Sequence, residues 1–191
     1  MVIGLRYYQE IEARPVAIYG KKGESSMKKI WLAGGCFWGV EAYFQQLKGV
    51  LETKVGYGQG ILENPTYQQV CSGTTGYTEV CEIVYDEDII PLPKVLEHFF
   101  RIIDPTTLNR QGPDQGTQYR TGIYYSDIGE NGLILHFIID MQKYYTENIV
   151  VEIQPVLNFY PAEEYHQNYL QKTAGGYCHV NLRLAKPEEK K

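Results

Sequence analysis

Apolar residues along this chain recur at two spacings, which together predict a domain of mixed strands and helices. Short apolar runs, alternating or continuous, predict strands at residues 30–33, 50–57, 79–85, 122–125 and 149–154. Helical spacing predicts a helix from about residue 36, further helices at 92–103, 133–145 and 162–170, and a short one after the turn at 64–67. The order of these elements indicates a two-layer α+β domain.

The helix expected at 133–145 is apolar on more than one side. Its expected core stripe comprises Ile134, Phe137, Ile138, Met141 and Tyr145. Leu133, Leu135 and Ile139 are apolar on other sides, and the helix is too short to span a membrane. Because apolar patches on that scale mark interfaces, we expect these three residues to be covered by residues 1–26 or by a partner subunit.

Length and composition predict one globular domain preceded by an extension. The chain has 191 residues, of which 43% are hydrophobic and 21% charged, as in ordinary globular proteins. Its net charge of −5 gives no reason to expect a nucleic-acid or membrane partner. Residues 1–26 hold no apolar run long enough for a signal peptide, so we expect a cytoplasmic protein. We expect an N-terminal extension at 1–26 and a single domain at 27–191, with a mobile tail from about residue 173.

The four cysteines predict free thiols. They are Cys36, Cys71, Cys81 and Cys178, and no pair has the C-x-x-C spacing of a structural zinc site. The chain is too cysteine-poor for a disulfide scaffold, so a reducing compartment is the default. Cys71 and Cys81 are expected to be small core residues.

Cys36 lies where the first strand meets the first long helix, in the stretch Gly34-Gly35-Cys36-Phe37-Trp38-Gly39. Two glycines before it permit a tight turn. A thiol at this position would sit near free backbone N–H groups and the positive end of the helix dipole, both of which favour the thiolate. We therefore expect an exposed, reactive cysteine; the alternative is a buried core residue.

Glu79 lies on the strand expected at 79–85. It shares a face with Cys81, Ile83 and Tyr85, so a carboxyl at the mouth of that apolar face would have a raised pKa. The alternative is a surface glutamate at a strand end. The loop at 104–120 is long and rich in hydrogen-bonding side chains, and such loops are usually functional.

The motifs resemble those of the A-type peptide methionine sulfoxide reductases, a family that repairs oxidised methionine. The resemblance starts at Gly35-Cys36-Phe37-Trp38-Gly39 and runs from about residue 27 to 182 with order and rough spacing intact. Its other parts are the stretches 55–57, 64–67, 73–79, 104–120, 159–167 and 176–179. The sequence departs from the family pattern at Tyr77-Thr78, where His-Ala is usual, and in residues 1–26.

This resemblance implies a ferredoxin-like α/β sandwich with long functional loops that reduces the S epimer of methionine sulfoxide, free or within proteins. It implies no cofactor and no metal, and thioredoxin as the reductant. It assigns Cys36 as nucleophile, which becomes a sulfenic acid, and Cys178 as resolving cysteine. The remaining implied positions are Phe37 and Trp38 around the substrate methyl group, Tyr67, Glu79 and Tyr119 around the sulfoxide oxygen, and Asp114 in support.

Other interpretations of the same residues stay open. Cys36 could serve a hydrolase or acyltransferase with His166 or His179 as base, or a redox switch or peptide-binding module without turnover. Phe37, Tyr67 and Tyr119 could be packing residues, and His166 a helix cap or supporting residue. An assay of S-methionine sulfoxide with dithiothreitol separates the reductase from both other classes.

Overall fold

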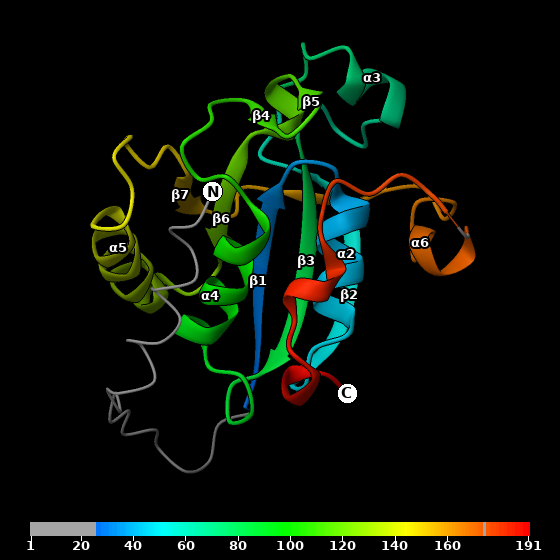
Figure 1. The fold of residues 1–191 in the computed structure, drawn as a ribbon. Coiled ribbons are helices and arrows are strands. Elements are labelled where there is room, and N and C mark those ends of the chain that lie inside the picture. The colour runs from blue at the N-terminus through cyan, green and yellow to red at the C-terminus, as the bar shows by residue number, and fades with distance from the viewer. Residues whose placement is uncertain (1–25, 174) are drawn as a thin grey trace.

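The protein is built around one six-stranded sheet (Figure 1). The structure is a computed structural model that describes residues 26–173 and 175–191. The strands are β1 (Met27–Gly34), β2 (Val50–Gly58), β3 (Thr78–Asp86), β6 (Thr121–Tyr125), β7 (Glu152–Pro155) and β8 (Phe159–Pro161). Their order across the sheet is β7-β6-β1-β3-β2-β8, and every neighbouring pair is antiparallel except β6 with β7.

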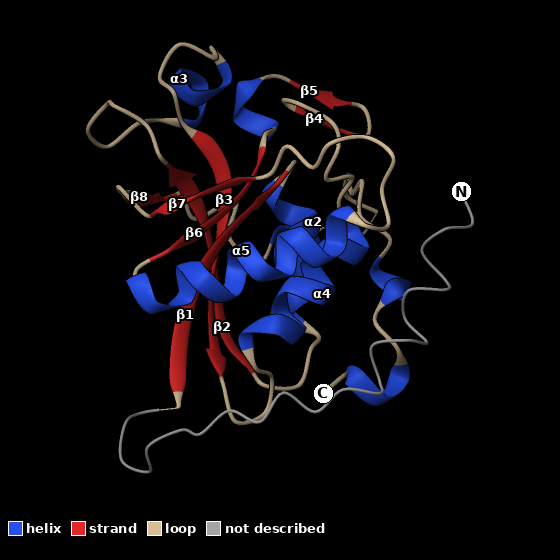
Figure 2. Cartoon of the chain, turned by 90° about the vertical axis from the view of Figure 1, so that its left-hand side faces the viewer, coloured by secondary structure: helices blue, strands red, loops and turns tan. Residues whose placement is uncertain are grey.

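The centre of the sheet has the ferredoxin-like order β6-β1-β3-β2. Helix α2 (Phe37–Gln45) connects β1 to β2, and α4 (Leu92–Ile102) lies between β3 and β6 in the chain. Both lie on one face of the sheet, and α5 (Ile128–Gln142) packs beside α4, β6 and β7 (Figures 1 and 2). The predicted α+β sandwich with a ferredoxin-like core is confirmed.

Alternation along the strands divides the apolar residues between the two faces. The helix-covered face carries Ile30 and Leu32 of β1, which join an apolar stripe along α2 and just beyond its end in the main core. That stripe, Phe37, Val40, Phe44 and Leu47, is at most 1% exposed. The opposite face carries a smaller cluster around Trp31 and Tyr124, covered by Val156 and Phe159 from the segment that leads into β8.

Helix α5 begins five residues earlier than its apolar spacing predicts. The Asp127 side chain caps its start by accepting a hydrogen bond from the Gly129 N–H at 2.8 Å. Gly129 and Gly132 would ordinarily signal a break, yet both lie within the helix. The predicted core stripe is confirmed, with Ile134 and Met141 buried. No helix in the described ranges has the length and apolarity needed to cross a membrane.

The helix predicted at 162–170 is wrong. Residues 164–168 form turns, and only α6 (Tyr169–Lys172) is helical. Asn168 has a left-handed backbone with φ of 54°, which interrupts a helix. The Gln167 side chain bonds both the N–H and the carbonyl of Val55, at 3.0 and 2.8 Å. This segment therefore uses a polar side chain to hydrogen-bond the edge of the neighbouring strand β2 and does not form a helix of its own.

Two irregular segments lie together at one end of the sheet (Figure 1). One is α3 (Tyr67–Cys71), which Thr66 starts with a capping box to Gln69. The other is the predicted functional loop, which holds β4 (Arg110–Gln111), β5 (Asp114–Gln115) and a 3₁₀ turn at Thr117–Tyr119. The turn between β1 and α2 opens toward these segments, so this end of the sheet gathers the candidate chemistry.

Candidate active site

Cys36 is the N-cap of α2 and follows a turn that requires glycine. Gly35 has φ of 80°, and a Cβ there would lie 2.6 Å from the Cβ of Gln111. The Cys36 side chain makes no capping hydrogen bond. It is 6% exposed, so the loop at 104–120 and the chain after α6 leave the thiol covered.

The expectation of an exposed thiol that favours the thiolate is wrong. Burial raises the pKa of Cys36 well above its usual range, and the neighbouring Glu79 carboxyl raises that pKa further. The Trp38 N–H lowers it by a smaller amount. The Phe37 N–H, which could have served the thiolate, donates instead to Glu79 Oε2 at 3.0 Å. Helix position alone did not reveal that the first free N–H binds a carboxyl.

Glu79 is a buried carboxylic acid. It lies on β3 with 2% exposure, so the alternative of a surface glutamate is wrong. Burial raises its pKa to about 8, with the Phe37 hydrogen bond lowering it and the charge of Asp114 raising it. The predicted raised pKa is confirmed, and at pH 7 the group is mostly protonated. It is therefore an acid that holds a proton at neutral pH, at the start of the helix that Cys36 caps.

An aromatic wall stands beside these two groups. The ring of His166 lies 5.2 Å from that of Phe37, 5.5 Å from Trp38 and 4.6 Å from Tyr67, between centroids. Trp38 stacks on Tyr169 at 3.8 Å. The indole N–H of Trp38 donates to His166 Nδ1 at 3.2 Å. Burial lowers the pKa of His166, so the ring is neutral with its proton on Nε2.

Tyr67 and Tyr119 face Glu79 from two different segments. Tyr67 starts α3, where its N–H donates to Glu163 Oε1 at 3.0 Å, and Tyr119 ends the 3₁₀ turn. Burial raises the pKa of both phenols, and the charge of Glu79 raises each further. Cys36 contributes to the shift of Tyr119 as well. Both phenols therefore keep their protons at neutral pH and can donate hydrogen bonds near Cys36.

Cys178 lies beside the first turn of α2. A Cβ on Gly39 would come within 3.3 Å of its sulfur, so glycine leaves room for the thiol. Cys178 is half-buried, and burial raises its pKa. Asp114 contacts this segment, since its Oδ2 accepts the Tyr177 hydroxyl at 2.9 Å and lies 3.7 Å from His179 Nδ1. Asp114 thus ties the functional loop to the chain around Cys178.

Residues 178–191, here called the C-terminal strap, follow α2 from its first turn to beyond its end (Figure 1). Gln46 Nε2 donates to the Leu182 carbonyl at 3.0 Å. Glu189 accepts two hydrogen bonds from Arg101, at 2.7 and 2.9 Å. The Lys191 N–H donates to the Gln46 carbonyl at 2.9 Å. The strap therefore has a fixed far end, while mobility from residue 173 stays a prediction.

The sequence analysis located the neighbours of the site only in part. His166 is not a helix cap but takes the supporting role that the sequence also allowed, since its Nδ1 accepts the Trp38 indole N–H within the aromatic wall. Cys71 is exposed, so the expectation of a core residue is wrong, whereas Cys81 is fully buried as predicted. Cys71 hydrogen-bonds the Tyr67 side chain from the end of the same short helix. Their spacing of four residues on a helix was the available signal.

Neither histidine proposed as a base is arranged to activate Cys36. His166 Nδ1 binds the Trp38 indole, and His179 Nε2 lies 3.1 Å from the Gly34 carbonyl. Neither ring contributes to the shift in the pKa of Cys36. Among the residues the structure describes, the acid beside Cys36 is Glu79, and this arrangement does not support a cysteine hydrolase.

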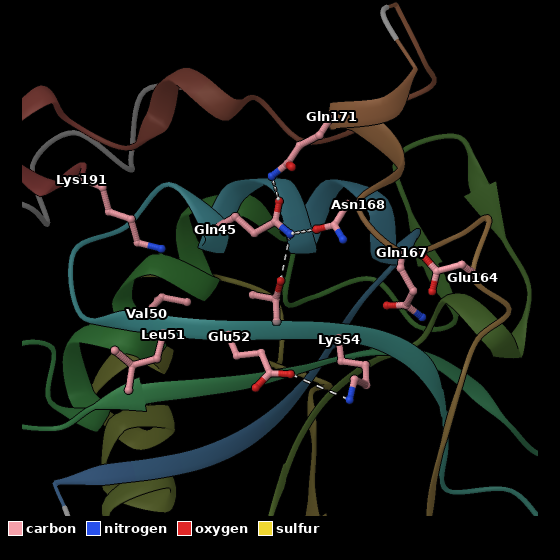
Figure 3. A pocket seen from close by; sticks show the side chains of 11 residues that line it. Gln45, Val50, Leu51, Glu52, Lys54, Glu164, Gln167, Asn168, Gln171 and Lys191 are labelled. Atoms are coloured by element: carbon pink, nitrogen blue, oxygen red, sulfur yellow. Dashed lines mark hydrogen bonds and ion pairs between the residues drawn. The ribbon is translucent and has the colours of Figure 1, made fainter.

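A separate cavity of about 480 Å³ lies between β2 and α6 (Figure 3). Gln45 lies at its centre, where its Nε2 donates to Asn168 Oδ1 at 2.6 Å and to Thr53 Oγ1 at 3.0 Å. Gln171 Nε2 donates to Gln45 Oε1 at 2.8 Å. The side-chain amides of Gln45, Asn168 and Gln171 therefore hydrogen-bond one another, and these bonds connect α6 to α2. The cavity lining includes no cysteine.

Comparison with known proteins places these features in one family. Residues 28–191 match the family profile of peptide methionine sulfoxide reductase. The chain is 58% identical over 156 residues to peptide methionine sulfoxide reductase MsrA of Clostridium botulinum, covering 82% of this chain and 99% of that protein.

Solved structures agree with the family profile. The reduced form of Mxr1 from Saccharomyces cerevisiae superposes with a TM-score of 0.79 at 39% identity, covering 85% of this chain and 96% of that one. The same yeast protein in complex with Trx2 has a TM-score of 0.55 at 27% identity, covering 78% of this chain and 89% of that one. With its buried Cys36 and Glu79 on this fold, the chain belongs to the peptide methionine sulfoxide reductase family.

Proposed function

We propose that the chain reduces the S epimer of methionine sulfoxide, free or within proteins, with Cys36 as nucleophile and Glu79 as proton donor. The observation that carries this proposal is a carboxylic acid with a pKa of about 8, hydrogen-bonded to the first N–H of the helix that Cys36 caps. A sulfoxide oxygen is a poor leaving group until it is protonated, so a thiolate and an acid are both required.

In the first step, the Cys36 sulfur attacks the sulfoxide sulfur while Glu79 transfers a proton to the oxygen, and the proton that Cys36 gives up returns Glu79 to its acid form. The S–O bond of the substrate breaks, the oxygen passes to Cys36 as a sulfenic acid, and methionine leaves. Tyr67 and Tyr119 donate hydrogen bonds to the same oxygen as charge develops on it. Protonation of Glu79 also helps in a second way, because the neutral acid no longer raises the pKa of Cys36.

The aromatic wall supports a preference for one epimer. Phe37 and Trp38 form an apolar surface for the methyl group, and Glu79 with the two tyrosines forms a polar side for the oxygen. With the sulfur facing Cys36, two substituents of the chiral centre and the direction of attack on it have fixed places. His166 holds the Trp38 ring through the hydrogen bond to its indole N–H.

Cys178 completes the cycle in this proposal. Its sulfur attacks the Cys36 sulfenic acid, a disulfide forms, and the hydroxyl leaves as water with the Cys178 proton. A dithiol of thioredoxin type then reduces the disulfide and is itself oxidised. The Trx2 complex of the yeast relative supports such a partner. All four thiols are free, which supports a reducing compartment such as the cytoplasm.

The test is an assay of the full chain with the S or R epimer of methionine sulfoxide and dithiothreitol, measuring methionine. We expect turnover with the S epimer only. Cys36→Ser should abolish it while the circular dichroism spectrum stays unchanged, because the variant removes the attacking sulfur and little volume. Sulfoxide turnover by the folded variant, or equal use of both epimers, would overturn the proposal.

A further inference from the structure

The outward side of α5 carries an apolar stripe that no described part of the chain covers. Ile128, Leu135 and Ile139 are 74%, 42% and 62% exposed, and at the helical spacing i, i+7, i+11 they fall on one side. Figures 1 and 2 show α5 at the outer edge of the helical layer. The three side chains thus form a continuous surface that includes two of the residues for which the sequence predicted a cover.

Gly132 falls within the same stripe, between Ile128 and Leu135. A glycine inside a helix costs about 0.5–1 kcal/mol relative to alanine, so a packing reason is expected. A Cβ at Gly132 would meet nothing within 4 Å, so no contact among the described residues accounts for it. A residue without a side chain between two exposed apolar residues leaves a shallow notch into which another segment can pack closely.

The geometry points to residues 1–25 of the same chain as the occupant, and we propose that they dock along this stripe. The described chain starts beside the beginning of α5. The Ser26 carbonyl accepts the Glu87 N–H at 2.8 Å, and Lys28 Nζ lies 3.7 Å from Oδ2 of Asp127, the α5 cap. The chain before Ser26 is therefore tethered next to the surface to be covered, which gives it a high effective concentration there.

The segment has the length and the composition to reach. Helix α5 with its 15 residues is about 22 Å long, and residues 12–25 can span about 46 Å when extended. That leaves residues 1–11, which include Val2, Ile3, Leu5 and Ile11, free to lie on the stripe. The family match begins at residue 28, and the Clostridium relative is matched over 99% of its own length. Almost none of the residues of that relative can therefore correspond to residues 1–25 of this chain. The extension therefore lies outside the sequence that this chain shares with the family, and we expect its docking on the stripe to be separate from the reaction.

A second copy of the chain is the competing occupant, and trypsin cleavage separates the two. Arg6 lies in the docking segment, so trypsin cleavage after Arg6 should be slower in the full chain than in a synthetic peptide of residues 1–25. Ile139→Lys should speed cleavage after Arg6 about tenfold, because it removes apolar contact from the docked state. Ile61→Lys is the matched control, since Ile61 is 89% exposed and lies outside α5.

Light scattering measures the molar mass of the same samples. We expect monomers for the wild type and both variants. Cleavage rates that Ile139→Lys leaves unchanged would overturn the proposal, and so would a wild-type dimer that this variant converts to monomers. As an independent readout, deleting residues 1–25 should raise hydrogen exchange in α5 but not in α2, and equal exchange in α5 would also refute docking. Sulfoxide reduction is not needed for any of these measurements, so they are independent of the proposed function.

Discussion

Two glutamates at opposite ends of helix α2 have pKa values shifted in opposite directions. Glu79, at the start of the helix, has no cation of the described chain among the causes of its shift, and burial raises its pKa to about 8. Glu189, in the C-terminal strap beyond the helix end, is also mostly buried, but Arg101 holds its pKa well below the usual range. Burial alone makes a carboxyl a proton donor, whereas burial beside a guanidinium makes it a permanent anion that can anchor a segment.

The two glutamates also affect stability in opposite ways. Between its unfolded pKa and about 8, Glu79 binds more protons in the folded state, so stability falls as pH rises through that window. Glu189 has a lowered pKa, so its contribution is present above its unfolded pKa and is lost only as pH falls toward its folded value. At neutral pH, Glu79 therefore lowers the free energy of unfolding, while Glu189 raises it. The surroundings of Cys36 and Glu79 are called the pocket below.

Cys178→Ser should separate the two regions most completely. The pocket remains intact, so a single turnover with S-methionine sulfoxide should still release about one methionine per enzyme, since chemistry precedes resolution. Thioredoxin-driven turnover should then stop, because no second thiol converts the sulfenic acid to a disulfide.

The measurement is methionine release by quenched flow for the first turnover and thioredoxin-coupled assay thereafter. Cys71→Ser is the matched control, since Cys71 is exposed at the end of α3. Undiminished thioredoxin-dependent cycling by Cys178→Ser would show that another thiol resolves Cys36.

Glu79→Gln should affect the pocket alone. Glutamine keeps an oxygen for the Phe37 N–H and a donor for the sulfoxide oxygen, but it has no proton to transfer. The single-turnover rate at saturating sulfoxide should fall on the order of 10²–10⁴-fold, the usual scale for a general acid.

The control is Glu82→Gln on the same strand, where the side chain faces the opposite side and pairs with Lys29 at 3.3 Å. Equal rates for wild type and Glu79→Gln would assign the proton to the tyrosines or to water.

Much of this pocket was predictable, for reasons visible in particular residues. Gly35 and Cys36 stand between a buried strand and an amphipathic helix, so local spacing located the turn. Glu79 alternates with apolar residues on β3, so period-two spacing revealed its burial. The charge state of Cys36 was not predictable, because it depends on a carboxyl 43 positions away that takes the first N–H of the helix.

The prediction of a helix at residues 162–170 was wrong for a related reason. Their apolar spacing resembles a helix, but Glu163 and Gln167 are used by Tyr57, Tyr67 and Val55, more than 90 residues earlier in the chain. An asparagine such as Asn168 adopts the left-handed backbone only in some contexts, so its presence in the sequence does not predict that conformation as a glycine would. The position of His166 follows from this turn, so it could not be derived without the tertiary contacts.

A smaller effect concerns Cys36 alkylation by iodoacetamide as a function of pH. Below about pH 8, Glu79 is protonated, so wild type and Glu79→Gln should react at similar rates. Above that pH, the carboxylate of the wild type opposes the thiolate. Because the variant lacks this charge, the pKa of Cys36 should be lower in the variant, and Cys36 should react faster there on the order of tenfold.

The Cys178 adduct provides the internal reference, quantified by mass spectrometry of the same digest. A rate difference already present at pH 6 would mean that Glu79 is ionised there. The absence of any difference at pH 10 would mean that Glu79 does not influence the thiol.

The smallest expected effect tests the anchor of the strap. Glu189→Gln removes the charge that binds Arg101 and keeps one of the two acceptor oxygens, with an NH₂ group in place of the other. The far end of the strap should then loosen, and the effective concentration of Cys178 near Cys36 should fall because the loop samples more conformations. We expect disulfide formation after the first turnover to slow by about threefold, with methionine release unchanged. Glu188→Gln, exposed and next in the chain, is the control. If methionine release slows as well, the anchor supports the pocket itself; if disulfide formation is unaffected, contacts near Gly39 alone position Cys178.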